Sequence, residues 1–357
     1  MRGLRADYQG VRVIADLPDP SPGPGEAVVR VRLAGVASTD ARLVTSDSRF
    51  VGIPGHELVG IVEQVNIPDD APPALREKRS LKGKRVVASP HVVCGTCDRC
   101  RSGLSAHCRS RQVIGFAPGG GSGGGGGVSR DGCLAERICL PATNLVVVPD
   151  AVTDEAAVLA VPLACAMHTL NMLRGETDAY ITVLGDNVLS LLTAQYLARS
   201  CQSLRALVSL PEYVRILERW GIKHRLVDEA GRRQDQAVVV DCTGTAAGLR
   251  LSMQHVRPRG LIVLKSPGGN AAYLPGVPLP STTDPAWMTA VDLTPLVSNE
   301  IRVQGSRDGS VAEAVRAMAN GEVELAGLVS KRYGIGQGVE ALKAAGEGGR
   351  VKVVVEV

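Results

Sequence analysis

Aromatic residues are scarce in this chain of 357 residues, at 3%. Its cores must therefore be aliphatic, and few rings remain for stacking on nucleic-acid bases. The net charge is only +4 and no long stripe of Lys or Arg occurs, which argues against nucleic acid as a partner. No run of about 18 apolar residues is present, so we expect no membrane span. The N-terminal residues carry an early Asp7 and no apolar stretch, unlike a signal peptide.

The length exceeds one ordinary core, so two domains are expected. Of the 9 cysteines, those outside a single short cluster are scattered along the chain. We interpret them as small buried hydrophobic residues in a reducing compartment, and expect a cytoplasmic protein. These scattered residues are Cys133, Cys139, Cys165, Cys201 and Cys242.

The cluster consists of Cys94, Cys97, Cys100 and Cys108. Two consecutive C-x-x-C steps place three thiols on tight turns, and the fourth follows after a short loop. Four thiolates at this spacing suit tetrahedral zinc, and four protein ligands leave no open position, so the metal would be structural. An iron–sulfur cluster is a weaker alternative, and unrelated or disulfide-paired cysteines are another.

The first part of the chain resembles a series of strands. Short β-branched runs at 11–15, 26–33, 58–65 and 82–87 are separated by Pro and Gly, which predicts a small, mostly antiparallel β structure. Residues 117–128 are mostly Gly, and such a run buries few side chains and is costly to order. We favour a surface insertion between two strands over a mobile flap above a cleft.

After Pro149 the pattern alternates between strands and helices. Thr153 is expected to cap a helix over 156–173. A final sheet strand is expected at 301–305, followed by two helices and a strand at 351–355. In between, the pattern predicts strands at 181–185, 204–209, 237–241 and 261–265, and helices at 188–199, 212–220 and 246–256. This alternation indicates an α/β fold with a parallel, doubly wound sheet.

Further motifs accompany the cysteine cluster in chain order: Gly35-Val-Ala-Ser-Thr-Asp40, Pro54-Gly-His-Glu57, Val183-Leu-Gly-Asp-Asn-Val-Leu189 and Val240-Asp-Cys-Thr-Gly244. With them, nearly the whole chain resembles the zinc-containing alcohol dehydrogenase branch of the medium-chain dehydrogenase/reductase superfamily. The cluster, with Gly95 and Gly103 inside it, is the most specific part of the resemblance.

This resemblance implies three segments. Residues 1–150 would form a GroES-like β-barrel catalytic domain that carries the zinc lobe at 94–108. Residues 151–295 would form a Rossmann dinucleotide-binding domain. Residues 296–357 would supply the last sheet strand and a tail that returns to the catalytic domain. The resemblance also implies a homo-oligomer, either a dimer or a tetramer.

The implied cofactor is NAD or NADP. The fingerprint G-x-G-x-x-G falls on 185–190, where only Gly185 is a glycine. Amides at the helix start can still face a phosphate, but Asn187 would crowd the pyrophosphate. The second strand ends at Ser209 with no acid for the ribose, and Arg215 lies on the next helix, so the choice between NAD and NADP stays open. The predicted cofactor-binding residues are Gly185, Asp186, Asn187, Val188, Leu189, Ser209 and Thr243.

The resemblance also implies a catalytic zinc with ligands from three places. His56 occupies one of them, but Ala37 and Val161 occupy the other two and offer no electron pair. We therefore expect no firmly bound catalytic zinc. Cys165, one helical turn after Val161, or Asp40 would be conceivable substitute ligands.

The predicted catalytic residues are Thr39, Asp40, His56 and Glu57. By resemblance, the Thr39 hydroxyl passes the substrate proton toward the cofactor ribose. His56 and Asp40 could form a buried acid–base pair, or His56 could be a hydrogen-bonded core histidine. His91 and His168 are interpreted as structural.

The leading hypothesis is an oxidoreductase that transfers a hydride between NAD(P) and a small alcohol or carbonyl without a firmly bound catalytic zinc. The alternative is a non-catalytic relative that binds a nucleotide or a protein partner and is stabilised by structural zinc. A third hypothesis, an active zinc dehydrogenase that uses Cys165, predicts two zinc ions per chain instead of one.

Overall fold

The chain folds into two compact units. The computed structural model describes residues 1–357 except Tyr8, 46–49, 116–129, Arg174, Thr177, Arg232, 266–290 and Gly348, and it leaves the side chains of 42–45 undescribed. The first unit draws its described residues from Met1–Val161 and Val311–Val357, and the second from Pro162–Asn270 and Pro278–Ser310. The glycine-rich run at 117–128 lies outside the described residues. The domain limits expected at 150 and 295 stay predictions.

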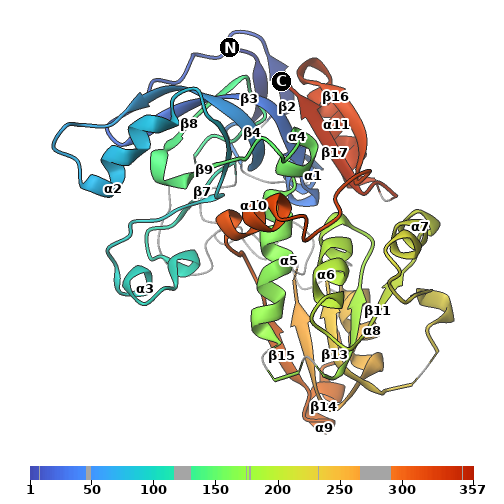
Figure 1. Cartoon of the computed structure of the whole chain (residues 1–357). Coiled ribbons are helices and arrows are strands. Elements are labelled where there is room, and N and C mark those ends of the chain that lie inside the picture. Colours follow the sequence, from blue (N-terminus) through green and yellow to red (C-terminus); the bar gives the residue numbers. More distant parts are fainter. Residues whose placement is uncertain are drawn as a thin grey trace. The chain divides into compact units, whose positions relative to one another are not determined.

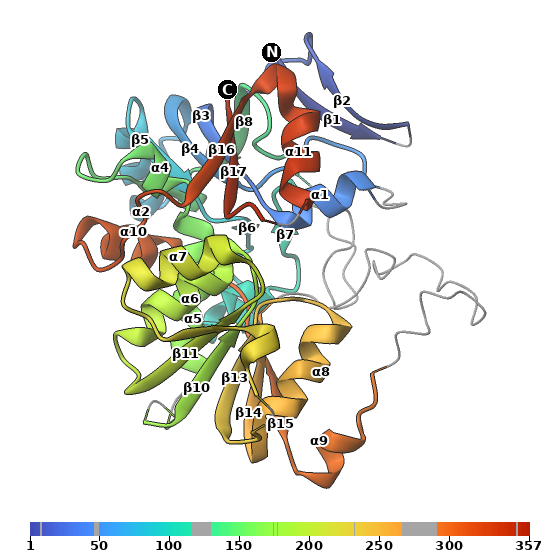
Figure 2. The same cartoon turned by 90° about the vertical axis from the view of Figure 1, so that its right-hand side faces the viewer.

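The first unit is built on a seven-stranded sheet in the order β16-β17-β3-β4-β5-β9, with β8 paired to β3. All its pairings are antiparallel except that of β16 with β17. Because β17 pairs with β3, the last strand of the chain lies beside one of the first (Figure 2). Its strands are β3 (Glu26–Val36), β4 (Glu57–Asn66), β5 (Arg85–Ala88), β8 (Arg137–Pro141), β9 (Leu145–Val147), β16 (Val329–Gly334) and β17 (Lys352–Glu356).

Smaller elements surround this sheet. β1 (Gly3–Asp7) and β2 (Gly10–Ile14) form a hairpin, and β6 (His91–Val92) pairs with β7 (Gln112–Val113). Helix α1 packs against α11 in this unit. The helices are α1 (Ser38–Thr45), α2 (Pro73–Arg76), α3 (Asp98–Arg101), α4 (Asp154–Ala157), α10 (Val311–Ala319) and α11 (Gly338–Gly346).

The core of the first unit is aliphatic, as the shortage of aromatic residues requires. Val29, Val31, Leu58, Val62 and Val86 are at most 2% exposed and alternate along the strands toward one face. Burial of each such side chain contributes about 1.5–3 kcal/mol. This core fixes the ends of β3 and β4, from which the candidate catalytic residues extend.

The second unit is a parallel six-stranded sheet in the order β12-β11-β10-β13-β14-β15, as the alternating pattern predicts. Helices α6, α7 and α8 pack against its strands (Figure 1). The strands are β10 (Tyr180–Leu184), β11 (Ser203–Val208), β12 (His224–Leu226), β13 (Gln236–Asp241), β14 (Val256–Leu264) and β15 (Arg302–Gly305). The helices are α5 (Ala160–Met172), α6 (Val188–Ala198), α7 (Pro211–Arg219), α8 (Ala246–His255) and α9 (Thr294–Ser298).

The helix predicted over 156–173 is two helices. Thr153 caps α4 as expected, because its hydroxyl accepts a hydrogen bond from the Ala156 N–H at 3.2 Å. However, α4 ends at Ala157 and α5 begins at Ala160. Apolar residues continue through the break, so hydrophobicity alone could not reveal it.

Candidate functional site

Four thiols converge after β6 in the first unit. Helix α3 begins directly after Cys97 and carries Cys100, while Cys94 and Cys108 flank it in the loop. The four Sγ atoms all lie within 4.8 Å of one another. Tetrahedral zinc with bonds of about 2.3 Å needs sulfurs about 3.8 Å apart, so the group fits that ion.

The four thiols differ in acidity. Backbone N–H groups of Thr96 and Cys97 lower the pKa of Cys94 to about 5. Desolvation and the neighbouring Cys97 and Cys108 raise the pKa of Cys100 to about 12. Four adjacent thiolates need a cation to ionise together, and a zinc ion would supply that charge. With all four positions filled by protein, the metal would be structural.

The first turn of α1 holds the Asp40 carboxylate in place. Its Oδ2 accepts a hydrogen bond from the Ala37 N–H at 2.8 Å, in the manner of a residue that caps a helix start. Its Oδ1 lies 3.2 Å from Nδ1 of His56, which directly precedes β4. Asp40 is fully buried and the His56 side chain is 14% exposed. The structure therefore brings these two predicted residues together as a carboxylate–imidazole pair.

The negative charge of Asp40 raises the pKa of the His56 imidazole. Burial opposes protonation of the ring, but the Asp40 carboxylate, with a smaller contribution from Glu57, outweighs it and raises the pKa of His56. Because Nδ1 faces the carboxylate, a proton exchanged with a substrate would pass through Nε2, the other ring nitrogen. This arrangement suits a general base or acid.

Glu57 is held by a partner that the sequence analysis did not identify. Its carboxylate forms an ion pair with Nζ of Lys352, and both side chains are at most 5% exposed. Lys352 also donates to the Val36 carbonyl at 3.1 Å. The two residues meet across β3 at Gly35, where an added Cβ would lie 3.0 Å from Lys352 Cε. Gly35 thus leaves the room in which this pair forms.

The remaining positions of the predicted zinc site hold no ligand. Ala37 contributes only its backbone to Asp40, and Val161 is a hydrophobic residue of α5 that is 7% exposed. Nearby, Cys133 donates to the Glu57 carbonyl at 3.4 Å, and burial, with the charges of Asp40 and Glu57, raises the pKa of its thiol well above the ordinary value. In the part of the chain that the structure describes, only the cysteine lobe groups three or more potential ligands closely enough for a metal.

In the second unit, the turn between β10 and α6 carries Asn187 and Ser190 where the dinucleotide-binding fingerprint has its second and third glycines, and these two residues cap the helix. Gly185 has a φ of 139°, which favours glycine, and lies against Cys242 at the end of β13. Asn187 has extended backbone angles, and its Oδ1 accepts from the Ser190 N–H at 2.9 Å while the Ser190 hydroxyl accepts from the Asn187 N–H at 3.3 Å. This reciprocal cap occupies two amides at the helix start and leaves those of Val188 and Leu189 for a phosphate.

Asp186 lies beside the end of β11, a strand that ends without an acid of its own. Its Oδ1 accepts hydrogen bonds from the N–H groups of Ser209 at 2.8 Å and Leu210 at 3.3 Å, directly after β11. The carboxylate therefore lies at the strand end where an acid binds the ribose hydroxyls of NAD. The sequence offers no signal for this placement, because Asp186 lies in the turn between β10 and α6 and not on β11 itself.

Thr243, the last predicted cofactor residue, follows β13. Its N–H and hydroxyl both donate to Oδ1 of Asp241, at 2.8 and 2.7 Å. Burial raises the pKa of Asp241 although these hydrogen bonds oppose the shift. The predicted cofactor residues of the second unit thus lie on the carboxyl ends of β10, β11 and β13, the edge where parallel sheets bind ligands.

Known proteins resemble this chain over nearly its whole length. Residues 23–150 match the alcohol dehydrogenase GroES-like domain. The L-threonine 3-dehydrogenases of Mesorhizobium japonicum and of a Chelativorans species are 27% and 28% identical, over 96% and 95% of this chain and 94% of each relative. A zinc-binding dehydrogenase of Sinorhizobium meliloti bound to NADP shares the fold, with a TM-score of 0.76, 22% identity and coverage of 100% of this chain and 99% of that one.

Residues 23–150 thus resemble the GroES-like domain of alcohol dehydrogenases, and the chain as a whole is similar to dehydrogenases over nearly its full length. A thermostable alcohol dehydrogenase of Pyrobaculum aerophilum with bound cobalt and zinc also shares the fold, with a TM-score of 0.79, 23% identity and coverage of 100% and 99% of the two chains. These findings support the expected family and confirm the α/β fold class and the dehydrogenase-like character. The roles of individual residues stay predictions.

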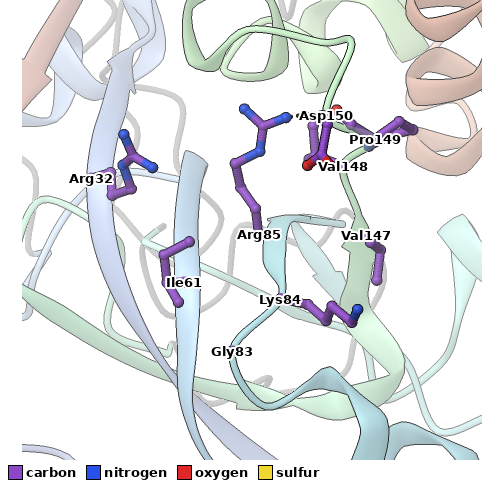
Figure 3. Close-up of a pocket in the computed structure, with 9 residues that line it drawn as sticks. All are labelled: Arg32, Ile61, Gly83, Lys84, Arg85, Val147, Val148, Pro149 and Asp150. Carbon is purple, nitrogen blue, oxygen red and sulfur yellow. Dashed lines mark hydrogen bonds between the residues drawn. The ribbon is translucent and has the colours of Figure 1, made fainter.

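Within this dehydrogenase-like chain, a hollow of about 620 Å³ in the first unit is lined by none of the predicted site residues. Figure 3 shows the residues that line it. Arg85 points across it toward the segment at 148–150 (Figure 3). Its guanidinium donates to the carbonyls of Pro149 and Val152, both at 2.6 Å, and to Asp154 at 2.9 Å. These hydrogen bonds occupy the Arg85 guanidinium and connect the segment at 148–150 to β5. We therefore assign no ligand to the hollow.

No helix in the described ranges is both long and apolar enough to cross a membrane.

Proposed function

We propose that this protein transfers a hydride between NAD(H) and a small alcohol or carbonyl compound, without a firmly bound catalytic zinc. The observation that carries the proposal is the pair formed by Asp40 and His56, at 3.2 Å, with no ligand at Ala37 or Val161 and with Glu57 held by Lys352. An imidazole whose pKa is raised by a carboxylate can exchange a proton with a substrate without a metal.

In the oxidation direction, His56 accepts the proton of the substrate hydroxyl at Nε2, and Asp40 stabilises the resulting imidazolium through Nδ1. Thr39, which precedes Asp40 in the first turn of α1, is proposed to relay this proton. The nicotinamide cofactor, when bound, accepts the hydride. Glu57 and Lys352 take no part in proton transfer because each neutralises the other in the buried sheet.

We favour NAD(H) over NADP(H) because of Asp186. Its carboxylate at the end of β11 can bond ribose hydroxyls through Oδ2, whereas a 2′-phosphate would bring negative charge against it. Asp186→Asn should therefore reduce the preference for NADH over NADPH in a fluorescence titration. The proposed choice of cofactor is wrong if the unaltered protein binds NADPH more tightly.

The test combines cofactor titration with pH profiles of kcat/KM over a panel of small alcohols. The panel begins with L-threonine, because relatives over nearly the full chain are L-threonine 3-dehydrogenases. We expect oxidation to rise with pH as His56 loses its proton, with the midpoint shifted to lower pH in Asp40→Asn. That variant retains an acceptor for the Ala37 N–H, and the exposed Asp150→Asn serves as its control. An unshifted midpoint would exclude His56 as the titrating base.

A non-catalytic, nucleotide- or partner-binding relative is the second candidate. The cap formed by Asn187 and Ser190 favours it, because it occupies amides that a pyrophosphate would otherwise use. The same titration separates the two proposals: if neither NADH nor NADPH binds, the oxidoreductase proposal fails and this one remains.

A further inference from the structure

A buried lysine lies at the carboxyl edge of the parallel sheet and has no role in the site described above. Lys265 directly follows β14 and is 7% exposed. Its Nζ donates to the Cys165 carbonyl at 2.7 Å, to the Ser306 hydroxyl at 2.8 Å and to the Arg307 carbonyl at 3.4 Å. These neutral acceptors use all three N–H groups of the ammonium, which leaves none to bind a ligand directly.

The hydrogen-bond chain continues to a histidine. The Ser306 hydroxyl lies 3.2 Å from Nδ1 of His168 on α5. Because an ammonium group can only donate, Ser306 accepts from Lys265 and can pass its own hydrogen to His168. Protonating His168 would place a second positive charge in the same cluster.

The positive charge of Lys265 has no anionic partner in direct contact among the residues that the structure describes. Its direct contacts are the neutral acceptors named above. The Asp308 carboxylate acts on Lys265 from a greater distance and forms its own ion pair with Arg307 at 2.7 Å. Burial lowers the pKa of Lys265, while Cys165, Cys242 and Asp308 oppose that shift. A charge in such surroundings acts over a longer range than one in water.

The sheet order indicates which part of a dinucleotide this charge would face. A dinucleotide lies across the carboxyl ends of the strands, with one mononucleotide on each half of the sheet. The half with β10, β11 and β12 carries Gly185 and Asp186, which suit the adenosine half and the pyrophosphate. The nicotinamide would therefore lie over β13, β14 and β15, where Lys265 and Ser306 follow the last two strands.

The nicotinamide ring is positively charged when oxidised and becomes neutral when it accepts a hydride. We propose that Lys265 makes this protein bind the reduced cofactor in preference to the oxidised one, by disfavouring a second positive charge at the carboxyl ends of β14 and β15. The proposal rests on the proposed function. Its consequence is that hydride transfer from a bound alcohol to the bound oxidised cofactor becomes more favourable, because the transfer removes the second positive charge.

The test measures dissociation constants for NADH, NAD⁺ and ADP-ribose by isothermal calorimetry. The quantity of interest is the ratio of the constants for NAD⁺ and NADH. In Lys265→Met we expect this ratio to fall about tenfold, which corresponds to about 1.4 kcal/mol. Unit charges up to about 10 Å apart interact by this amount at an effective dielectric constant of about 20. ADP-ribose lacks the ring, so its affinity should stay within about twofold.

Three further variants control the result. Lys265→Arg keeps the charge and should keep the ratio, and Lys223→Met makes the same change at an exposed lysine of the second unit. Lys265→Gln removes the charge but keeps a donor for the Cys165 carbonyl, so it replaces Lys265→Met if thermal melting shows that the latter is unfolded.

The outcomes separate the two proposals. A ratio that is unchanged in a folded Lys265→Met or Lys265→Gln overturns the role of Lys265, while binding of NADH leaves the proposed function intact. A protein that binds neither NADH nor NAD⁺ overturns the proposed function, and this inference with it.

Discussion

At the scale of residues, the candidate site depends on two buried carboxylates with different partners. Asp40 faces an imidazole, whereas Glu57 faces an ammonium group. The first pair can exchange a proton with a ligand because His56 is partly exposed. The second is closed within the sheet and holds β17 to β4 across Gly35. We thus propose that the neighbouring residues His56 and Glu57 serve chemistry and stability separately.

We predict that Lys352→Met destabilises the protein by about 3–5 kcal/mol, because it leaves the Glu57 carboxylate buried without its partner. The double variant Glu57→Gln with Lys352→Met should recover much of this loss, since no buried charge remains. Urea unfolding measures both, with Lys331→Met on exposed β16 as a control. A single variant as stable as the original protein would show that the pair does not form.

At the scale of elements, the backbone amides at the start of α6 can either be capped by the helix's own side chains or bind a pyrophosphate. In the fingerprint of dinucleotide-binding turns, the second glycine lets the backbone approach the pyrophosphate. Here Asn187 and Ser190 close a reciprocal cap, and Asn187 also donates to the Cys242 carbonyl at 2.8 Å. The helix is stabilised by its own side chains, at the expense of amides available to a ligand.

Asn187→Gly should therefore tighten NADH binding several-fold while lowering stability only slightly, since Gly in place of Asn at a helix cap costs a few tenths of a kcal/mol. Its loss of the hydrogen bond to Cys242 adds to that cost. Fluorescence titration and thermal melting measure the two effects. Weaker NADH binding by a folded variant would mean that Asn187 itself contacts the cofactor.

At the scale of the whole molecule, the two units have separate chemistry and separate sources of stability. The first contains the cysteine lobe and the pair of Asp40 and His56, while the second contains the nucleotide-type edge and Lys265. The lobe is a local structure that four thiolates and a metal can hold without a hydrophobic core, as small zinc sites do. The homo-oligomer expected from the family resemblance stays a prediction.

Elemental analysis should find about one zinc per chain. Its removal by a chelator under reducing conditions should lower Tm by at least about 5 °C, because zinc-binding free energy contributes to folding. NADH binding should survive, since its predicted residues lie in the second unit. Two zinc ions per chain would instead support an ordinary zinc dehydrogenase, with Cys165 as the substitute ligand that the sequence suggested.

Features that depend on local spacing could be predicted from the sequence. The cysteine steps determine that four thiols can meet, and Thr153 determines a helix start. The alternation after Pro149 likewise determines a parallel sheet, because hydrophobic periodicity is set by short-range geometry.

Contacts between distant residues were decided only by the tertiary structure. Lys352 reaches Glu57 across 295 positions of sequence, and Asp186 reaches the end of β11 from the preceding turn. Lys265 and Ser306 meet because β14 and β15 are neighbours in the sheet. No pattern in the sequence encodes such pairs, since they depend on which strands lie side by side and on where a missing side chain, as at Gly35, leaves room.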